Sequence, residues 1–268
     1  MPWAQVHWRS DILRKQTTTQ VLLPSVGRPP FAALYLLHGL MGDSMTWLRH
    51  SRLEWYVREL PLVVVLPDGY RGFYTNNEQG PDYARHCGEE LPGFIERTFP
   101  VQSARHARAI GGFSMGGYGA LRVGLGYPER FCSVHSHSGA LLRMNLDLSA
   151  RQARGDPVFR RNPPEFFAEL QRIFGRRFVG TRHDPIALVG RARRRHRRLP
   201  RILIDCGTED SLLGGNRDFH RELEELHVPH LYREFPGGHD WDYWDLHIRE
   251  ALSFHAGSLH LASTPRVA

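Results

Sequence analysis

The sequence has few cysteines, no long apolar run and almost no lysine. Its three cysteines are widely spaced among 268 residues and form no Cys-x-x-Cys pair, so neither a disulfide framework nor a zinc knuckle is indicated. The longest uninterrupted apolar runs, 31–37 and 62–66, fall far below the ~18–20 residues that a membrane span requires. The first residues show neither an apolar stretch of signal-peptide length nor a basic leader. We therefore expect a soluble cytoplasmic protein with no membrane partner.

The positive charge is concentrated in one segment. The formal net charge is +7, and Arg191–Arg198 places six arginines in eight residues. Such a block can contact phosphate. However, Lys15 is the sole lysine, which indicates a general preference for Arg codons, and no aromatic residue interleaves the block to stack on bases. We expect a solvated helical face or loop and no nucleic-acid partner, and an anion- or nucleic-acid-binding protein is the distant alternative.

Short apolar runs alternate with longer amphipathic stretches from residue 31 onward. Phe31–Leu37 and Leu62–Leu66 are continuously apolar and bounded by Pro or Gly, which is typical of strands buried on both faces. Weaker strand candidates are Ala107–Gly111, Phe131–His135, Ile202–Cys206 and Leu231–Phe235. The predicted helices are Trp47–Leu60, Asp82–Phe99, Gly116–Gly126, Arg217–His227 and Trp241–His255. This alternation predicts an α/β fold with a mostly parallel central sheet and helices on both faces.

The chain shows no internal repeat and no linker with a clear change of composition, so we expect a single domain over residues 1–268 with a core of about 31–256. Residues 141–200 depart from the alternation because they are rich in Arg and interrupted by proline, and we expect a small irregular insertion over the active site. Residues 1–15 are expected to add a strand, and residues 257–268 to form a frayed tail. Pro92 is expected to kink the second predicted helix or start a new turn.

The strongest chemical signal is the Gly112-Phe113-Ser114-Met115-Gly116 pentapeptide. A short apolar run precedes it, and a stretch that can open a helix follows it. A nucleophile elbow requires this strand–turn–helix arrangement, with the serine in a strained turn and the two glycines allowing close backbone packing. The pattern predicts Ser114 as a nucleophile at a helix N-terminus, where developing negative charge is favoured.

A serine nucleophile needs a base and an acid that orients the base. His239 lies in a tight Pro-Gly-Gly loop between the last predicted strand and the final helix, whereas His135 and His137 near another strand end have no comparable loop. Asp210 lies in the loop beyond a strand end, after the serine and before the histidine. We predict His239 as the base and Asp210 as the acid.

Two neighbouring acids were alternatives for the third position. Glu209 is the fallback for Asp210, and Asp205 lies within the predicted strand. Asp240, next to the predicted base, is expected to cap the last helix as its N-cap residue.

The oxyanion of the reaction needs two backbone N–H donors. Met115, directly after the nucleophile, supplies one. The other is expected from Leu40, in the loop His38–Asp43 after the first core strand. In this arrangement His38 braces the loop and is not the base.

The motifs taken together resemble the esterase D-type family of esterases, which includes tributyrin-type carboxylesterases and S-formylglutathione hydrolases. The segments that carry the resemblance are Leu36–Asp43 with Trp47-Leu48, Pro67–Gly69 with Gly72–Thr75, Glu90–Pro92, Gly112–Gly119, Ser138-Gly139, Cys206–Asp210 and Gly238–Trp241. The resemblance covers roughly residues 31–256. It implies an α/β-hydrolase fold, the triad and the oxyanion donors given above, and an acyl pocket lined by Trp47, Phe73 and Tyr74.

The expected function is that of a cofactor-independent serine carboxylesterase for short-chain acyl esters. The same chemistry on S-formylglutathione, or acyl transfer to an alcohol, is the alternative. No His-x-x-x-His pair beside a suitable carboxylate is present, so no metal site is predicted. The expected partner is a small acyl ester or thioester, and a homo-oligomer is compatible with the sequence.

Overall fold

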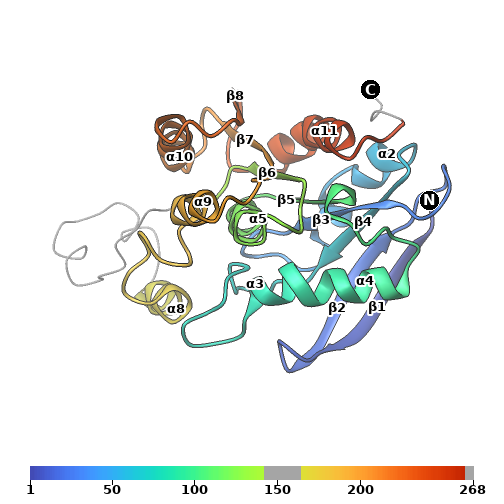
Figure 1. Cartoon of the computed structure of the whole chain (residues 1–268), viewed down its shortest axis with the longest axis horizontal. Coiled ribbons are helices and arrows are strands. Elements are labelled where there is room, and N and C mark those ends of the chain that lie inside the picture. The colour runs from blue at the N-terminus through green and yellow to red at the C-terminus, as the bar shows by residue number, and fades with distance from the viewer. Residues whose placement is uncertain (142–163, 263–268) are drawn as a thin grey trace.

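The fold is built on one sheet, and the computed structural model describes residues 1–141 and 164–262. In this part of the chain eight strands lie in the order β1-β2-β4-β3-β5-β6-β7-β8 (Figure 1). Their bounds are β1 Trp3–Ser10, β2 Lys15–Leu22, β3 Ala32–Leu37, β4 Leu62–Pro67, β5 Arg108–Gly112, β6 Ser133–His137, β7 Arg201–Gly207 and β8 Leu231–Phe235. β1, β2 and β4 pair antiparallel, and the remaining neighbours pair parallel. The expected mostly parallel sheet is confirmed.

The helices cover both faces of this sheet. Their bounds are α1 Thr46–His50, α2 Leu53–Val57, α3 Tyr83–Arg85, the π-helix η1 His86–Glu90, α4 Leu91–Thr98, the 3₁₀-helix η2 Arg105–Ala107, α5 Met115–Gly126, α8 Pro164–Phe174, α9 Pro185–Arg194, α10 Leu213–Glu225 and α11 Trp241–Ser258. In Figure 1, α2 and α11 lie on one side of the sheet and α4 lies on the other. Helices on both faces are therefore confirmed as well.

The alternation of side chains along β3 divides the core into two clusters. Leu34 and Leu36 point to the cluster that holds residues of α1, α2 and α11. Tyr35 and Leu37 point to the cluster that holds residues of α4, α5, α8, α9 and α10. All six residues of β3 are buried because successive side chains of a strand point to opposite faces and here both faces are covered.

The N-terminal region forms a hairpin of two strands where one strand was expected. β2 contains Thr17, Thr18 and Thr19, a polar run that a search for continuous apolar residues does not identify as a strand. The branched threonine side chains favour an extended backbone, and Thr17 and residues 19–22 are buried.

One predicted helix is divided in the structure. The stretch 47–60 forms α1 and α2, separated at Ser51, whose hydroxyl donates to the Trp47 carbonyl at 2.5 Å. The stretch 82–99 stays helical: α3, η1 and α4 follow one another without a gap from Tyr83 to Thr98. Pro92 is the second residue of α4 and comes directly after the π-helical turn of η1.

The described part of residues 141–200 is more regular than expected, because it contains α8 and α9. The Asp184 side chain caps α9 by accepting from the Ile186 N–H at 3.0 Å. Arg193–Arg198 are exposed at the end of α9 and in the turn beyond it, as expected for a solvated face. Residues 142–163 of the expected insertion and 263–268 of the expected tail lie outside the described residues.

The final helix is longer than predicted, since α11 continues to Ser258. Among the helices of residues 1–141 and 164–262, none has the length and apolar character needed to cross a membrane.

Candidate active site

Ser114 lies in a tight turn between β5 and α5. Its φ of 54° and ψ of −119° are strained for a residue with a side chain. A Cβ on Gly112 would lie 2.7 Å from the Leu37 carbonyl oxygen, and one on Gly116 would lie 2.5 Å from the same atom. Glycine is therefore required on both sides of the serine, and the turn has the form of a nucleophile elbow.

The structure brings Ser114, His239 and Asp210 into one chain of hydrogen bonds. His239 Nε2 lies 2.9 Å from Ser114 Oγ, and His239 Nδ1 lies 2.8 Å from Asp210 Oδ2. Burial alone would raise the pKa of the Asp210 carboxyl, but hydrogen bonds from His239 and from the Leu212 N–H outweigh burial and hold this pKa below its usual value. An ionised Asp210 can hold the imidazole with Nε2 directed at the serine.

The loops that carry the acid and the histidine are bonded to each other. β7 and β8 end side by side at Gly207 and Phe235. Beyond them the Glu209 N–H donates to the Gly237 carbonyl at 3.1 Å, and the Gly237 N–H donates to the Glu209 carboxylate. Glu209, the fallback acid, therefore faces the backbone of the histidine loop, and its neighbour Asp210 faces the imidazole.

The other two acids near His239 have separate partners. Asp205 hydrogen-bonds to His137 and Tyr243 in the interior. Asp240 accepts from the Tyr243 N–H at 3.0 Å, so the predicted N-cap of α11 is confirmed.

The two predicted oxyanion donors lie on either side of the serine turn. Met115 opens α5, whose first N–H groups have no acceptor within the helix. Leu40 lies half-buried in the loop between β3 and α1. A Cβ on Gly39 would meet the Phe113 ring at 2.5 Å, so this loop packs closely against the residue that precedes Ser114.

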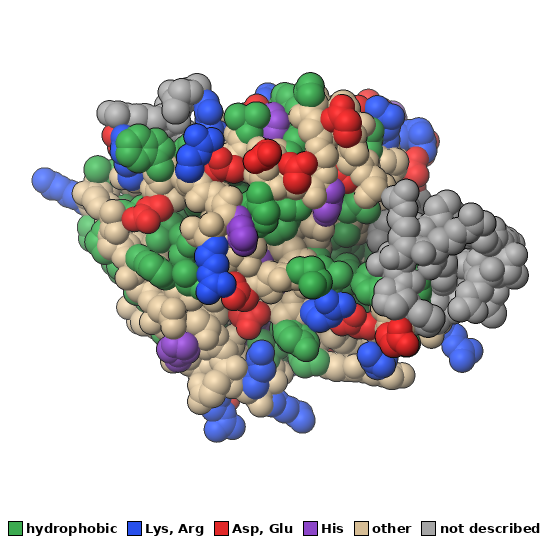
Figure 2. All heavy atoms as spheres, turned by 180° about the vertical axis from the view of Figure 1, so that it is seen from behind, with side chains coloured by type: hydrophobic (Ala, Val, Ile, Leu, Met, Phe, Trp, Pro, Cys, Tyr) green, Lys and Arg blue, Asp and Glu red, His purple; other side chains and the backbone are tan. Residues whose placement is uncertain are grey.

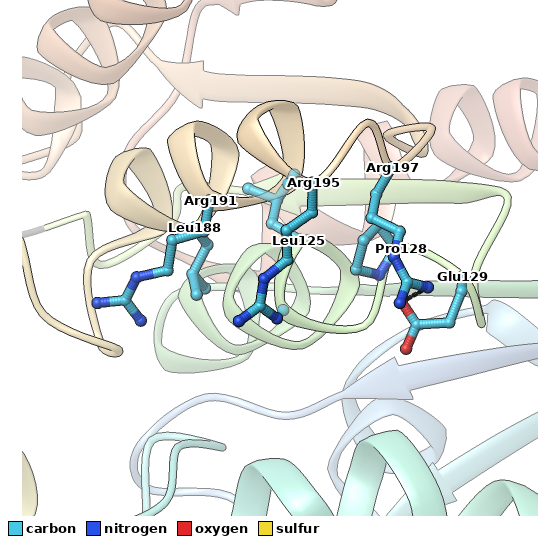
Figure 3. A pocket seen from close by; sticks show the side chains of 9 residues that line it. Leu125, Pro128, Glu129, Leu188, Arg191, Arg195 and Arg197 are labelled. Atoms are coloured by element: carbon cyan, nitrogen blue, oxygen red, sulfur yellow. Dashed lines mark ion pairs between the residues drawn. The ribbon is translucent and has the colours of Figure 1, made fainter.

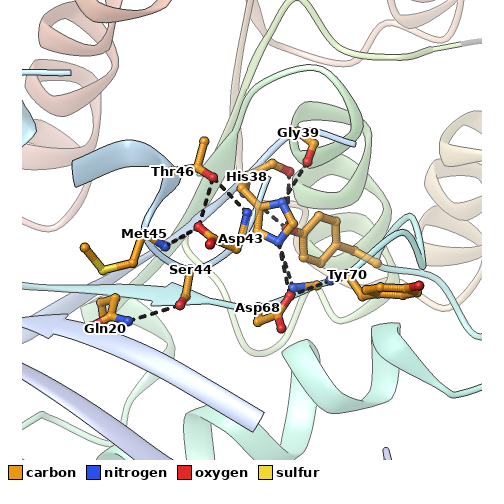
Figure 4. A network of polar contacts seen from close by, with 11 residues as sticks. Gln20, His38, Gly39, Asp43, Ser44, Met45, Thr46, Asp68 and Tyr70 are labelled. Atoms are coloured by element: carbon orange, nitrogen blue, oxygen red, sulfur yellow. Dashed lines mark hydrogen bonds and ion pairs between the residues drawn. The ribbon is translucent and has the colours of Figure 1, made fainter. Parts of the chain in front are cut away.

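His38 holds this loop in place through a contact at each of its ring nitrogens (Figure 4). Its buried ring places Nδ1 2.7 Å from the Gly39 carbonyl, and its Nε2 accepts from the Gly69 N–H at 2.9 Å. Nδ1 is therefore the protonated nitrogen, and the ring joins the loop after β3 to the loop after β4. The Tyr74 hydroxyl adds bonds to the His38 N–H and carbonyl, at 3.1 and 3.2 Å.

The structure places Trp47, Phe73 and Tyr74 in the core, which differs from the expected lining of an acyl pocket. Trp47 Nε1 donates to the Leu37 carbonyl at 3.1 Å, and its ring packs edge-on against Phe113 at 5.2 Å. All three side chains are buried. Large rings gain more from such burial than from exposure at a pocket wall, and the polar atoms of Trp47 and Tyr74 find partners inside.

Sequence reasoning overlooked an aromatic contact of the candidate base. The His239 ring meets Trp244 edge-on, with centroids 4.9 Å apart. Trp244 belongs to the first turns of α11, close after the histidine. Its signal was the cluster Trp241, Tyr243 and Trp244 immediately downstream of the loop. Among the described residues, no group of three or more His, Cys, Asp or Glu is arranged to hold a metal ion.

The family model described as "Putative esterase" matches residues 10–255 of the chain. The chain belongs to this esterase family. An acetyl esterase from Caldicellulosiruptor saccharolyticus is 33% identical over 263 residues, which cover 93% of this chain and 96% of that protein. The range matched by the family model spans Ser114, Asp210 and His239.

Solved structures of esterase relatives extend the comparison to the fold. The fluorophosphonate-binding serine hydrolase FphF of Staphylococcus aureus superposes with a TM-score of 0.82 at 28% identity, over 95% of this chain and 98% of that one. The S-formylglutathione hydrolase FrmB of the same organism gives a TM-score of 0.79 at 28% identity with the same coverage. This esterase is thus a serine hydrolase of carboxylic esters with the α/β-hydrolase fold.

Proposed function

We propose that this esterase hydrolyses short-chain acyl esters through Ser114, His239 and Asp210. The observation that carries the proposal is the hydrogen-bond chain that runs from the Asp210 carboxylate through the imidazole to Ser114 Oγ. The contact between His239 Nε2 and Ser114 Oγ, 2.9 Å, has the length that proton transfer requires, and the contact to Asp210, 2.8 Å, orients the imidazole.

The geometry supports a two-step reaction. Ser114 Oγ attacks the ester carbonyl carbon while His239 Nε2 takes the hydroxyl proton, and the Leu40 and Met115 N–H groups donate to the resulting oxyanion. Breakdown of the tetrahedral intermediate breaks the ester C–O bond, and the alcohol leaves with the proton from His239. Water then attacks the acyl-enzyme and gives a proton to His239. As the bond between the acyl carbon and Ser114 Oγ breaks, His239 returns this proton to Oγ, which releases the acid and regenerates the enzyme. Asp210 stays ionised throughout and stabilises the imidazolium.

The likeness to a relative named acetyl esterase supports small acyl groups as substrates of this chain. The likeness to FrmB favours a second candidate substrate, S-formylglutathione, because a thioester carbonyl undergoes the same attack. Hydrolysis of p-nitrophenyl acetate through octanoate, compared with S-formylglutathione, separates these candidates. We expect acetate to butyrate to be turned over faster than octanoate, with a graded decline since each methylene is worth only about 1–3 kcal/mol. A kcat/KM that rises steadily to octanoate would contradict the short-chain proposal.

We propose no nucleic-acid role for Arg191–Arg198. Arg197 lies 3.6 Å from Glu129, which neutralises one charge (Figure 3). Arg191 and Arg195 point over a hollow of about 260 Å³, the α9 hollow, whose floor is the apolar side chains of Leu125 and Leu188. On the face opposite to the view of Figure 1, shown in Figure 2, acidic and basic side chains are interspersed, so the described part of this face carries no uniformly basic surface of the kind that binds nucleic acid.

A further inference from the structure

A second hollow, of about 430 Å³, lies beside the loop that follows β4. Its walls come from three parts of the chain: Lys15 at the start of β2, the segment 70–83, and α8. We call it the Lys15 hollow. Its size is within the range of pockets that bind small organic molecules, and the rings of Tyr70 and Tyr83 give it an apolar wall.

The Lys15 hollow has an excess of positive charge. Lys15, Arg71 and Arg172 line it, against the single carboxylate of Glu169. Arg71 is already neutralised, because its Nε and Nη2 donate to the two Glu169 oxygens at 2.6 and 2.5 Å. Within residues 1–141 and 164–262, neither Lys15 nor Arg172 has a carboxylate at ion-pair distance, and both side chains are exposed. Two cations are therefore available to an incoming anion.

The Lys15 hollow adjoins the loop that carries one proposed oxyanion donor. Arg71 Nη1 lies 3.6 Å from the sulfur of Met41, the residue directly after Leu40. Gly69, two residues before Arg71, donates to the ring of His38 that braces the same loop. Arg71 therefore borders both the Lys15 hollow and the loop with the proposed donor. Glu169 fixes one side of its guanidinium, and the Leu40-Met41 segment lies on the other. The Lys15 hollow therefore lies next to the loop that carries this proposed donor.

We propose that the Lys15 hollow binds a carboxylate carried by the ester substrate, so that this esterase prefers anionic esters to neutral ones. The inference rests on the proposed function and names the substrate class of that site. Lys15 supplies a flexible ammonium from the β-hairpin, and Arg172 supplies a guanidinium from α8. The carboxylate belongs either to the acyl half or to the alcohol half of the ester.

The test compares two pairs of esters that differ only in a negative charge. The pair 4-acetoxybenzoate and its methyl ester places the charge on the alcohol half, and the pair monophenyl adipate and its methyl ester places it on the acyl half. For each pair, we measure the ratio of kcat/KM for the anionic ester to kcat/KM for the neutral ester. The ratio is measured with the full chain, with Lys15→Gln/Arg172→Gln, and with the matched control Arg194→Gln/Arg195→Gln, which removes the same charge from the C-terminal end of α9.

We expect the ratio for at least one pair to fall roughly five- to tenfold in the Lys15→Gln/Arg172→Gln variant, as two exposed ion contacts are lost. The control should leave both ratios within about twofold of the parent, since distant surface charges are screened. The pair that responds identifies the half of the ester that carries the carboxylate. Unchanged ratios in both pairs, or an equal fall in the control, would overturn the inference. Failure of the proposed function is a different result, namely no hydrolysis of the neutral esters.

Discussion

Two aspartate–histidine pairs lie near the C-terminal end of β7, and only one of them forms a hydrogen bond with a serine. Asp205 lies inside β7 and contacts His137 Nδ1 at 2.6 and 2.8 Å. Asp210 lies in the loop beyond β7 and contacts His239 Nδ1 at 2.8 Å. The carboxylate–imidazole contact is the same in both pairs, so this contact alone does not make a base.

The difference lies at the second ring nitrogen. The His239 side chain is 31% exposed and directs Nε2 at Ser114, whereas the His137 side chain is 0% exposed and its Nε2 has no hydrogen-bond partner among the described residues. A substrate can reach the first pair and cannot reach the second. His137 instead acts through its backbone, because its carbonyl accepts from the Ser114 N–H at 2.9 Å. The two histidines therefore differ in position and not in pairing: His239 lies in a loop beside a serine, and His137 lies in the interior.

The largest expected effect comes from the serine. Ser114→Ala should lower kcat by at least about a thousandfold, because loss of a triad member leaves only the catalysis due to the oxyanion donors and binding. Hydrolysis of p-nitrophenyl acetate measures this loss. A fluorophosphonate probe, followed by mass spectrometry of the labelled peptide, should modify Ser114 in the parent chain. Near-normal turnover in the variant would remove Ser114 from the mechanism.

Substituting the two aspartates tests the comparison directly. Asp210→Asn should lower kcat by about 10³–10⁴-fold with little loss of stability, because the imidazole loses its orienting charge. Asp205→Asn should instead lower the free energy of unfolding by about 3–5 kcal/mol, since a buried pair is broken, while kcat of the folded protein changes less than about tenfold. Steady-state kinetics give kcat, and denaturant titration gives the free energy of unfolding, for each of the two variants. The reverse pattern would exchange the roles of the two pairs.

Two buried histidines of the interior, His135 and His255, should make the free energy of unfolding depend on pH. Burial lowers the pKa of His255 to about 3, and burial also lowers the pKa of His135, whose ring contacts His255 at 2.7 Å. The unfolded chain binds protons at these groups below about pH 6.5, where the folded chain does not, so the free energy of unfolding should fall with pH from about 6.5 toward 3. Each group contributes up to about 1.4 kcal/mol per pH unit.

Denaturant titrations across this range measure the slope. His255→Gln should make it shallower, and the exposed control His7→Gln should leave it unchanged. An equal slope in the parent and in His255→Gln would show that the buried histidines do not cause the acid sensitivity.

The smallest effect is expected at the arginine block. Replacing Arg193, Arg194 and Arg195 by Gln should change kcat/KM for a neutral ester by less than about twofold, because a neutral substrate gains nothing from electrostatic steering. Tight, salt-sensitive binding of DNA or RNA by the parent chain, lost in the triple variant, would contradict the solvated-face interpretation.

Much of the fold was predictable because its central strands are continuous apolar runs. β3 and β4 could be read directly, while β2 could not, since its Thr-rich sequence forms a strand through pairing with its neighbours. At the division of 47–60 into α1 and α2, the Ser51 hydroxyl donates to the Trp47 carbonyl and accepts from the Leu53 N–H, and the Arg52 N–H donates to Asp245. Helix periodicity does not reveal such contacts.

The candidate site, like the fold, could be predicted only in part from the sequence. Chain order and loop position were sufficient to select Asp210 over Asp205, and the structure brings it to His239. The family resemblance implied that Trp47 and Tyr74 line an acyl pocket, whereas both side chains are buried in the structure. Sequence motifs show that an aromatic residue is near a site, but the direction of its side chain depends on the packing of distant segments, here β5 and α11.

The bonding between the loops 207–210 and 236–239 limits how this enzyme can change in length. Three backbone-mediated contacts hold the two loops in one register, with the Thr208 N–H donating to the Phe235 carbonyl at 2.8 Å and Glu209 and Gly237 exchanging two further bonds. Asp210 and His239 are therefore held in one register by the backbone around them. An inserted residue between Phe235 and His239 would move the imidazole away from Asp210 and Ser114 at once.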